Sequence, residues 1–116
     1  MGKNLDIVVL MDFYGKLLTD KQRDALELYY GGDYSLSEIA DDLDISRQGV
    51  RDSIKRGEHQ LLEMEEKLGL RQRFSEMSVQ IDEIIALCEK ISAQTNEAAD
   101  LSDRIRQICL QLKEEL

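Results

Sequence analysis

The sequence predicts an all-α protein, and three observations support this class. The chain of 116 residues contains no proline and is 42% hydrophobic, a composition typical of a folded, mostly helical protein. Apolar residues recur every three or four positions, which is the period of an amphipathic helix. Two short segments carry the paired polar residues that cap helix N-termini. We therefore expect a bundle of helices.

The first predicted helix lies between Asn4 and Leu17. Its apolar residues follow an i+4 series that would form one helical face, namely Leu5, Val9, Phe13 and Leu17. The same stretch contains Asp6 and Asp12, which a signal peptide would not carry in its apolar core. No apolar run of the sequence approaches the roughly 20 residues of a membrane span. We therefore expect a cytoplasmic protein without a membrane span.

Two capping boxes predict the starts of the next two helices. Thr19 stands three residues before Gln22, and Ser35 stands three residues before Glu38. At this spacing the hydroxyl and the longer side chain each accept a hydrogen bond from the other residue's backbone N–H. The first of these helices is expected to end at the glycine pair 31–32, because glycine tolerates the left-handed conformation of helix ends. The second, "SLSEIADDL", is followed by a turn at residues 44–45.

A longer helix is expected after this turn. Ser46 would cap it, and Gly69 follows Leu68 as a stop signal. Two helices joined by so short a turn cross at a steep angle and form a helix-turn-helix. The glycine within the second helix indicates a close crossing with another helix. At about 100° per residue, the inward face would consist of Val50, Ile54, Gly57 and Leu61.

The opposite face of this helix carries the candidate nucleic-acid-binding residues. Arginine and glutamine side chains reach base edges, and lysine and arginine also bind phosphates. The candidates are Arg47, Gln48, Arg51, Lys55 and Arg56. The acidic Asp52 and the single histidine, His59, share this face. The alternative interpretation is a plain helical bundle with a solvated charged face, because short motifs of this kind also recur by chance.

Charge argues against tight binding to a nucleic-acid duplex. The formal net charge is −9, and residues 1–70 contain 9 basic and 15 acidic residues. The acids include Glu38, Asp41, Asp42 and Asp44 on the first motif helix and its turn. Repulsion between separated charges is screened beyond roughly 10 Å at ordinary salt. We therefore expect nucleic-acid binding that is weak and salt-sensitive.

Four segments between Met11 and Leu70 carry a family resemblance. They are "DFYG.LLT.KQ", "LYY..D.SL.EIA", "SRQ.V.D.IKR" and "E.KL", in this order. The stretch closely resembles the YlxM family of small bacterial helix-turn-helix proteins and, more distantly, region 4 of sigma factors. This resemblance implies a sigma-region-4-like helix-turn-helix bundle at residues 1–70. Two positions depart from the family pattern, because Gly49 and Arg51 stand where members usually have alanine and an aromatic residue.

The resemblance also implies a function. Members are described as DNA-binding proteins and as accessory factors of the signal recognition particle (SRP) pathway. It implies a non-enzymatic accessory or regulatory protein that binds SRP RNA or DNA, with the SRP GTPase or its receptor as a protein partner. That GTPase is usually basic in its RNA-binding domain, which would attract the candidate docking residues Asp41, Asp42 and Asp44. The alternative is a DNA-binding transcription regulator that uses the Ser46–Arg56 helix.

The sequence does not indicate an enzyme or a cofactor. It contains no glycine-rich phosphate loop, no metal-ligand spacing and no nucleophile–base pair. Cys88 and Cys109 lack the paired spacing of a zinc site. We therefore expect no catalytic residues, no metal site and no cofactor. The two cysteines are expected to be buried thiols that pack as small apolar groups.

Residues 71–116 are expected to form a C-terminal helical extension. Two apolar series follow helical spacing, the first being Phe74, Met77, Ile81, Ile84, Cys88 and Ile91, and the second Ala98, Leu101, Ile105, Ile108 and Leu112. The two series do not share one phase, so the segment is either a hairpin or one helix with a heptad discontinuity. The stripe would be covered by the N-terminal helices of the same chain or by a second chain in a coiled coil. We favour a homodimer, with this segment as the dimerisation element.

Overall fold

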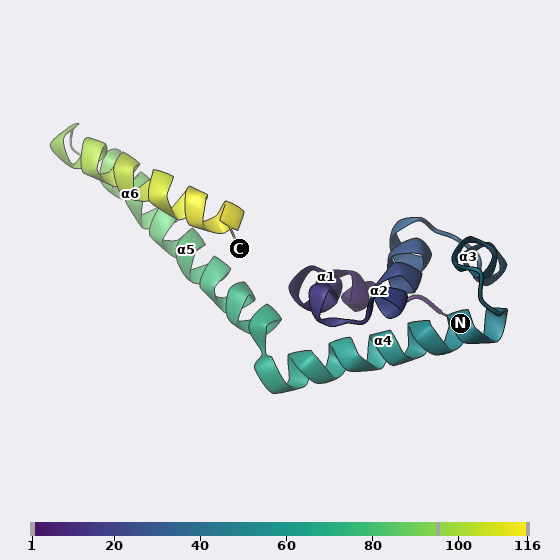
Figure 1. Cartoon of the computed structure of the whole chain (residues 1–116). Coiled ribbons are helices and arrows are strands. Elements are labelled where there is room, and N and C mark those ends of the chain that lie inside the picture. Colours follow the sequence, from purple (N-terminus) through teal and green to yellow (C-terminus); the bar gives the residue numbers. More distant parts are fainter. Residues whose placement is uncertain (1, 95, 116) are drawn as a thin grey trace. The chain divides into compact units, whose positions relative to one another are not determined.

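The computed structural model describes residues 2–94 and 96–115 (for residue 97, the backbone alone), and all regular structure in these ranges is helical. The α-helices are α1 (Leu5–Tyr14), α2 (Asp20–Leu26), α3 (Leu36–Leu43), α4 (Arg47–Leu68), α5 (Leu70–Ser92) and α6 (Asn96–Glu115) (Figure 1). A 3-10 helix, Gly15–Leu17, follows α1, and a π-helix, Glu27–Gly31, continues α2. None of the described helices is long and apolar enough to cross a membrane. The predicted all-α class is confirmed.

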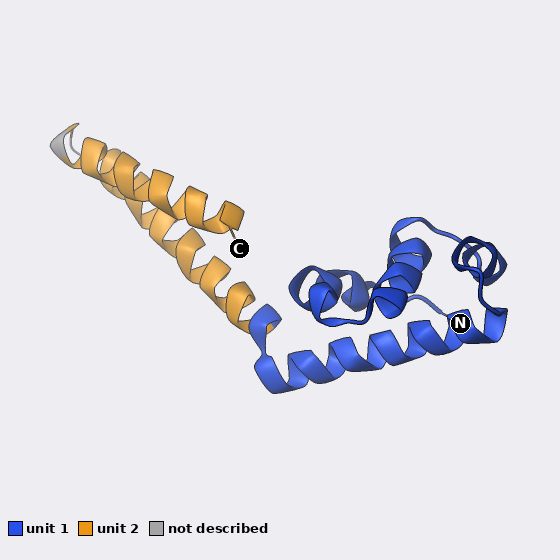
Figure 2. Cartoon of the chain, in the orientation of Figure 1, with its two compact units in different colours: residues 1–71 blue, residues 72–116 orange. Residues whose placement is uncertain are grey.

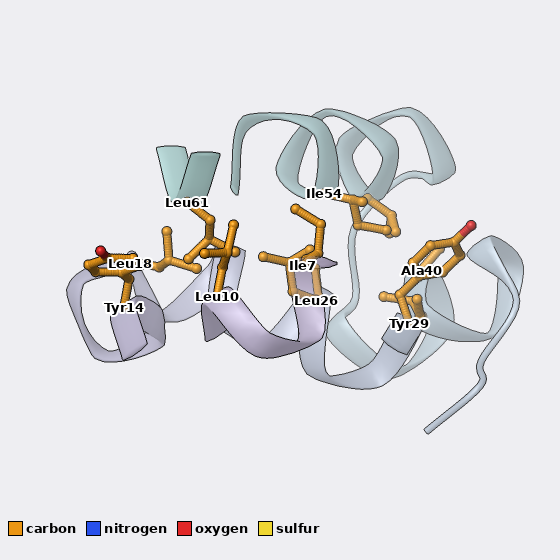
Figure 3. Packing of buried hydrophobic residues seen from close by; sticks show 12 residues of the cluster. Ile7, Leu10, Tyr14, Leu18, Leu26, Tyr29, Ala40, Ile54 and Leu61 are labelled. Carbon is orange, nitrogen blue, oxygen red and sulfur yellow. The ribbon is translucent and has the colours of Figure 1, made fainter. Parts of the chain in front are cut away.

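The chain divides into two compact units, residues 1–71 and residues 72–116 (Figure 2). The first unit is built on α4, against which α1, α2 and α3 all pack. The inward face predicted for α4 is confirmed, because all four of its residues are buried. The core of this unit consists of Ile7, Leu10, Tyr14, Leu18, Ala25, Leu26, Tyr29, Ile39, Ala40, Val50, Ile54 and Leu61 (Figure 3).

Local polar contacts start three of these helices as the sequence predicts. The Thr19 hydroxyl accepts from the Gln22 N–H at 3.2 Å, and the Gln22 side chain accepts from the Thr19 N–H at 3.4 Å. Ser35 and Glu38 make the same reciprocal pair at 3.1 and 3.3 Å. The Ser46 hydroxyl accepts from the backbone of α4 at 2.9 Å. Each cap satisfies N–H groups that the helix itself leaves unpaired.

The buried face of α1 differs from the predicted one. Leu5 is 78% exposed and Leu17 is 64% exposed, whereas the residues that face α4 are Ile7, Leu10 and Tyr14. The α-helix also ends at Tyr14, three residues earlier than expected. The prediction of the face was wrong because α1 is apolar on nearly every side, so spacing alone does not show which side packs.

The π-helix at the end of α2 was not predicted. The Gly32 N–H donates to the Glu27 carbonyl at 3.0 Å, a bond that spans five residues in place of four. Within this wider turn Tyr29 and Tyr30 both point inwards, with ring centroids 5.2 Å apart in an edge-to-face arrangement. The Tyr30 hydroxyl donates to Glu58 of α4 at 2.8 Å. The wide turn therefore lets two consecutive aromatic residues contact the unit.

A hydrogen-bond network fixes the exit from α4. The Tyr14 hydroxyl donates to Glu65 at 2.7 Å and accepts from the Leu70 N–H at 3.1 Å. The same Glu65 oxygen accepts from the Arg71 N–H at 3.0 Å. Gly69, between the two helices, has a φ of 62°, the left-handed conformation that glycine adopts most easily. Tyr14 and Glu65 thus hold the turn after α4 against α1.

The second unit is a hairpin of two antiparallel helices, which decides between the two predicted arrangements of this segment. The Ser102 hydroxyl of α6 donates to the Cys88 carbonyl of α5. Lys113 and Asp82 form an ion pair at 2.7 Å. Cys88 and Cys109 are buried free thiols, as expected.

Candidate nucleic-acid interface

The helix-turn-helix consists of α3, a turn at residues 44–46, and α4. Asp44 ends α3 with a φ of 55°, and its N–H donates to the Ala40 carbonyl. Aspartate is one of the few side chains that tolerate this left-handed conformation. Ile45 then turns into the core, where it packs beside the buried Ala40. The turn therefore fixes the crossing of α3 and α4 and leaves the outer face of α4 free.

All five predicted nucleic-acid-binding residues are exposed on α4. The helical repeat places Gln48, Arg51 and Lys55 within an arc of about 60°. Arg47 lies in the first turn, on the side towards the core. Arg56 lies on the opposite flank, beyond the acidic Asp52. The structure therefore brings three of the candidates together on one side and separates Arg56 from them.

Asp52 already has a partner on this face. The Gln48 side-chain amide donates to the Asp52 carboxylate at 3.1 Å, the spacing of one helical turn. A base edge would compete with this carboxylate for the amide of Gln48. The acid also lowers the positive potential in the middle of the face.

Arg56 faces a groove between α4 and the start of α2. The groove has a volume of about 360 Å³ and is lined by Thr19, Lys21, Gln22, Gly49, Asp52, Ser53 and Arg56. Lys21 and Arg56 supply two positive charges to the lining of this groove. Sequence reasoning missed Lys21, because it lies 35 positions from Arg56 in the chain and only the packing of α2 on α4 brings the two together.

The predicted docking acids occupy different places. Asp42 lines a second depression, of about 440 Å³, with Asp24, Glu27, Leu28, Gly32, Tyr34 and Leu43. Asp41 is exposed about 100° further round α3. Asp44 is exposed in the turn. The depression that contains Asp42 combines three acids with an aromatic and two aliphatic side chains.

Comparison with known proteins assigns the family. The family model described as "Putative helix-turn-helix protein, YlxM / p13 like" (UPF0122) matches residues 1–108. The chain belongs to the UPF0122 family. The resemblance inferred from the four sequence segments is thereby confirmed. The family description names a helix-turn-helix protein, and this motif binds DNA in many proteins.

Several relatives that carry the family designation match most of this chain. A UPF0122 protein of Thermoanaerobacter sp. (strain X514) is 56% identical over 80 residues, which is 69% of this chain and 68% of that protein. A UPF0122 protein of Acetivibrio thermocellus is 45% identical over 109 residues, covering 92% of this chain and 93% of the relative. A third, from Desulforamulus reducens, is 41% identical over 111 residues, 95% of each chain.

Gly49 lies in the first turn of α4. A Cβ atom at Gly49 would lie 3.2 Å from the Ser46 hydroxyl oxygen, which caps the helix through the Gly49 N–H. A larger side chain would require the cap to shift by a few tenths of an ångström. The glycine also contributes to the groove beside Arg56.

Proposed function

We propose that this UPF0122 protein binds nucleic acid through α4 and acts as a non-enzymatic accessory or regulatory protein of the SRP pathway. One observation carries the proposal. Four exposed basic residues, here called the basic stripe, lie on the second helix of a helix-turn-helix, namely Arg47, Arg51, Lys55 and Arg56. This is the helix that such motifs place on nucleic acid. Gln48 adds a side chain that is able to read a base edge.

The charge of the chain favours RNA of the particle over a long DNA duplex. Duplex specificity requires strong backbone attraction, to which each good base contact adds about 1–3 kcal/mol. Here a net charge of −9 opposes approach to an extended polyanion outside the immediate contact. A compact RNA that is already partly neutralised by its own proteins imposes less of this repulsion. SRP RNA is therefore the proposed nucleic-acid partner.

The acidic face of α3 supports a protein partner in the same pathway, the SRP GTPase or its receptor. Asp42 lies in a depression that also contains Tyr34 and Leu28. A basic side chain with an apolar neighbour matches both components of this lining. Asp41 and Asp44 lie nearby on α3 and its turn and would extend the negative surface towards such a partner.

The proposal includes a homodimer formed through residues 72–116. Dimeric helix-turn-helix proteins present two recognition helices and bind two half-sites. Two linked copies of α4 would bind more tightly than one copy, because binding of the first raises the effective concentration of the second.

A second candidate function is transcription regulation, in which the Ser46–Arg56 segment of α4 reads a DNA site. It is favoured by the placement of Gln48 and Arg51 on one side of the first turns of α4. Those two side-chain types make the common bidentate contacts to adenine and guanine in the major groove.

The test is a comparison of binding affinities at equal salt. The ligands are the SRP RNA, the assembled particle, the SRP GTPase alone, and random duplex DNA, with genomic fragments as a selection for defined DNA sites. We expect the tightest binding to the particle or its RNA, with a slope of log affinity against log salt near −3 to −4 for about four phosphate contacts. Tighter binding to a defined DNA site would establish the transcription-regulator function instead.

Two matched variants separate the effect of the basic stripe on binding from the effect of net charge. In the first variant the four stripe residues become alanine, and we expect binding to be lost while circular dichroism shows unchanged helicity. The control variant loses the same total charge elsewhere, through Lys16→Ala, Lys67→Ala, Arg73→Ala and Lys90→Ala. Retained binding in the first variant, or equal loss in both, would remove the stripe from the mechanism.

A further inference from the structure

The contact between α5 and α6 buries one large aliphatic residue together with small and polar ones. The buried residues of the hairpin are Ile81, Cys88, Ser102 and Cys109, at 2–8% exposure. On α6 the two buried members are thus a serine and a cysteine. Arg106 and Lys113 are half-buried on the same side of α6. Such a seam buries little apolar surface, although an isolated pair of helices depends on that surface for most of its stability.

Most of the large apolar residues of the hairpin lie outside this seam, although Ile81 is buried in it. Four on α5 and four on α6 are between 42% and 69% exposed. They include the α6 series that the sequence predicted as an apolar stripe. We call them the apolar face, which consists of Met77, Ile84, Leu87 and Ile91 with Leu101, Ile105, Ile108 and Leu112.

The two halves of the apolar face lie on the same side of the hairpin. On α5 the exposed set is rotated by roughly 70° from the buried Ile81 and Cys88, against the chain direction. On α6 the exposed set is rotated by about the same angle, in the same sense, from Ser102 and Cys109. Because the two helices are antiparallel, equal rotations in the same sense bring both sets to one side.

The other side of the hairpin is polar. Four exposed acids lie there, namely Asp82, Glu89, Asp103 and Glu114. The ion pair between Asp82 and Lys113 bridges the two helices on that side. Two exposed apolar residues, Val79 and Leu110, stand among these acids. The hairpin is therefore amphipathic as a whole, with its large exposed aliphatic residues gathered on one side around the polar Gln80.

We propose that the apolar face binds the same face of a second copy of this chain, so that two hairpins form a four-helix bundle. The inference deepens the homodimer proposed above by naming its interface, and it does not depend on what α4 binds. A two-fold axis makes each patch pair with itself. The face suits this arrangement because both helices have similar length and contribute four large aliphatic side chains each.

The exposed area supports an interface of this kind. Together the eight side chains expose roughly the area of four whole leucine-sized residues, which exceeds the few hundred Å² that a monomer usually leaves in one apolar patch. With the flanking residues, this approaches the ~800 Å² per partner of a standard stable interface. Burying it would also supply the second apolar layer that the α5–α6 seam lacks, as in other four-helix bundles.

The decisive experiment places glutamates on one side of the hairpin or the other. Leu87→Glu with Ile105→Glu charges the apolar face, and Val79→Glu with Leu110→Glu charges the polar side. The pairs are matched, since Leu87 and Val79 are both 57% exposed and Ile105 and Leu110 are 46% and 43% exposed. The full chain is studied by sedimentation velocity at about 50 µM, because dimer population depends on protomer concentration.

We expect the unchanged chain and the polar-side variant to sediment as dimers. The apolar-face variant should be monomeric, with a dimer dissociation constant raised about a hundredfold or more, because its carboxylates would be buried unpaired. If the glutamates reduce helicity, Leu87→Gln with Ile105→Gln applies the same test without charge. A monomeric unchanged chain, or an equal effect of the two variant pairs, would overturn the interface. A monomer that still binds SRP RNA would leave the proposed function of α4 standing.

Discussion

A Cβ atom on Gly57 of α4 would lie 2.7 Å from Cδ1 of Leu26 on α2, and 3.4 Å from Cγ of the same side chain. Leu26 is fully buried in the core, so the contact would fall on a packed side chain of α2. The absence of a side chain at Gly57 therefore sets the distance between the two helices. The sequence predicted a close crossing at this position, and the structure identifies α2 as its partner.

Gly57→Ala should lower the free energy of unfolding by about 1–2 kcal/mol. Overpacking a core typically costs about 1–3 kcal/mol. The higher helix propensity of alanine would offset up to about 1 kcal/mol of this cost. Urea denaturation measures the difference. Gly31→Ala is the control, because no atom lies within 4 Å of a Cβ there, and its stability should be unchanged or slightly higher. Equal stability of both variants would show that Leu26 adapts without cost.

Tyr14→Phe should destabilise the first unit by about 1–3 kcal/mol, the usual cost of leaving buried polar groups unpaired. The change removes the donor to Glu65 and the acceptor of the Leu70 N–H. Glu65→Gln is the matched comparison, because its amide oxygen still accepts from the Tyr14 hydroxyl, and it should cost less. Denaturation curves of both variants test this order, and a larger loss for Glu65→Gln would contradict it.

The stability of the fold should fall above pH 10. Burial, with a further contribution from the hydrogen bond to Glu58, raises the pKa of Tyr30 from 10.0 to about 12. Burial likewise raises the pKa of Tyr14. A group whose pKa is higher in the folded state stabilises the fold fully below its unfolded pKa, and this contribution is lost as the pH rises through the folded pKa.

The check is the free energy of unfolding measured between about pH 9 and pH 12. We expect a decline that begins near pH 10 in the unchanged protein. The Tyr30→Phe variant should have a lower starting stability and a shallower decline, because it lacks one of the two phenols whose pKa is raised in the folded state. An identical slope in the variant would mean that Tyr30 does not couple to folding.

Lys21→Ala should weaken nucleic-acid binding and reduce the steepness of its salt dependence by about one unit. The reason is that Lys21 shares the groove of Arg56, where one phosphate would meet both side chains. Lys16→Ala removes the same charge from an exposed residue outside that groove and should leave the salt slope unchanged. Salt titrations of both variants against one RNA decide the matter, and equal slopes would exclude Lys21 from the contact.

Asp52→Asn should tighten binding about two- to fivefold, the size expected for a change in one exposed charge. It removes the negative charge from the middle of the basic stripe and weakens the contact that holds Gln48. Glu66→Gln makes the same charge change near the far end of α4 and should have little effect. If both changes tighten binding equally, the cause is net charge and not the local face.

The features that the sequence predicted depend on residues close together in the chain. The caps of Thr19, Ser35 and Ser46 each need only three residues of context, and the inward face of α4 follows from polar residues on its other side. Where one helix is apolar nearly all round, as α1 is, the pattern does not indicate the packed side. This is why Ile7 and not Leu5 faces the core.

The remaining features depend on contacts between distant segments. Lys21 joins the candidate site only because α2 packs on α4. In the hairpin, spacing favoured Leu101 and Ile105 as a seam, yet Ser102 and Lys113 are residues of α6 that bond to α5. Spacing identifies apolar stripes but does not say whether the same chain or another one covers them.

The wide turn at Glu27–Gly31 has a consequence for how chains of this family are aligned. Its backbone bond spans five residues, so it contains one residue more than an ordinary helical turn would need. A relative that lacks one residue here could make the same turn as a plain α-helix, and the segments after it would keep their orientation relative to α2. Tyr29 and Tyr30 could not then both reach their present partners. In an alignment, a one-residue gap in this segment therefore indicates that the core is packed differently. A gap of the same size in a surface loop indicates only a change of loop length.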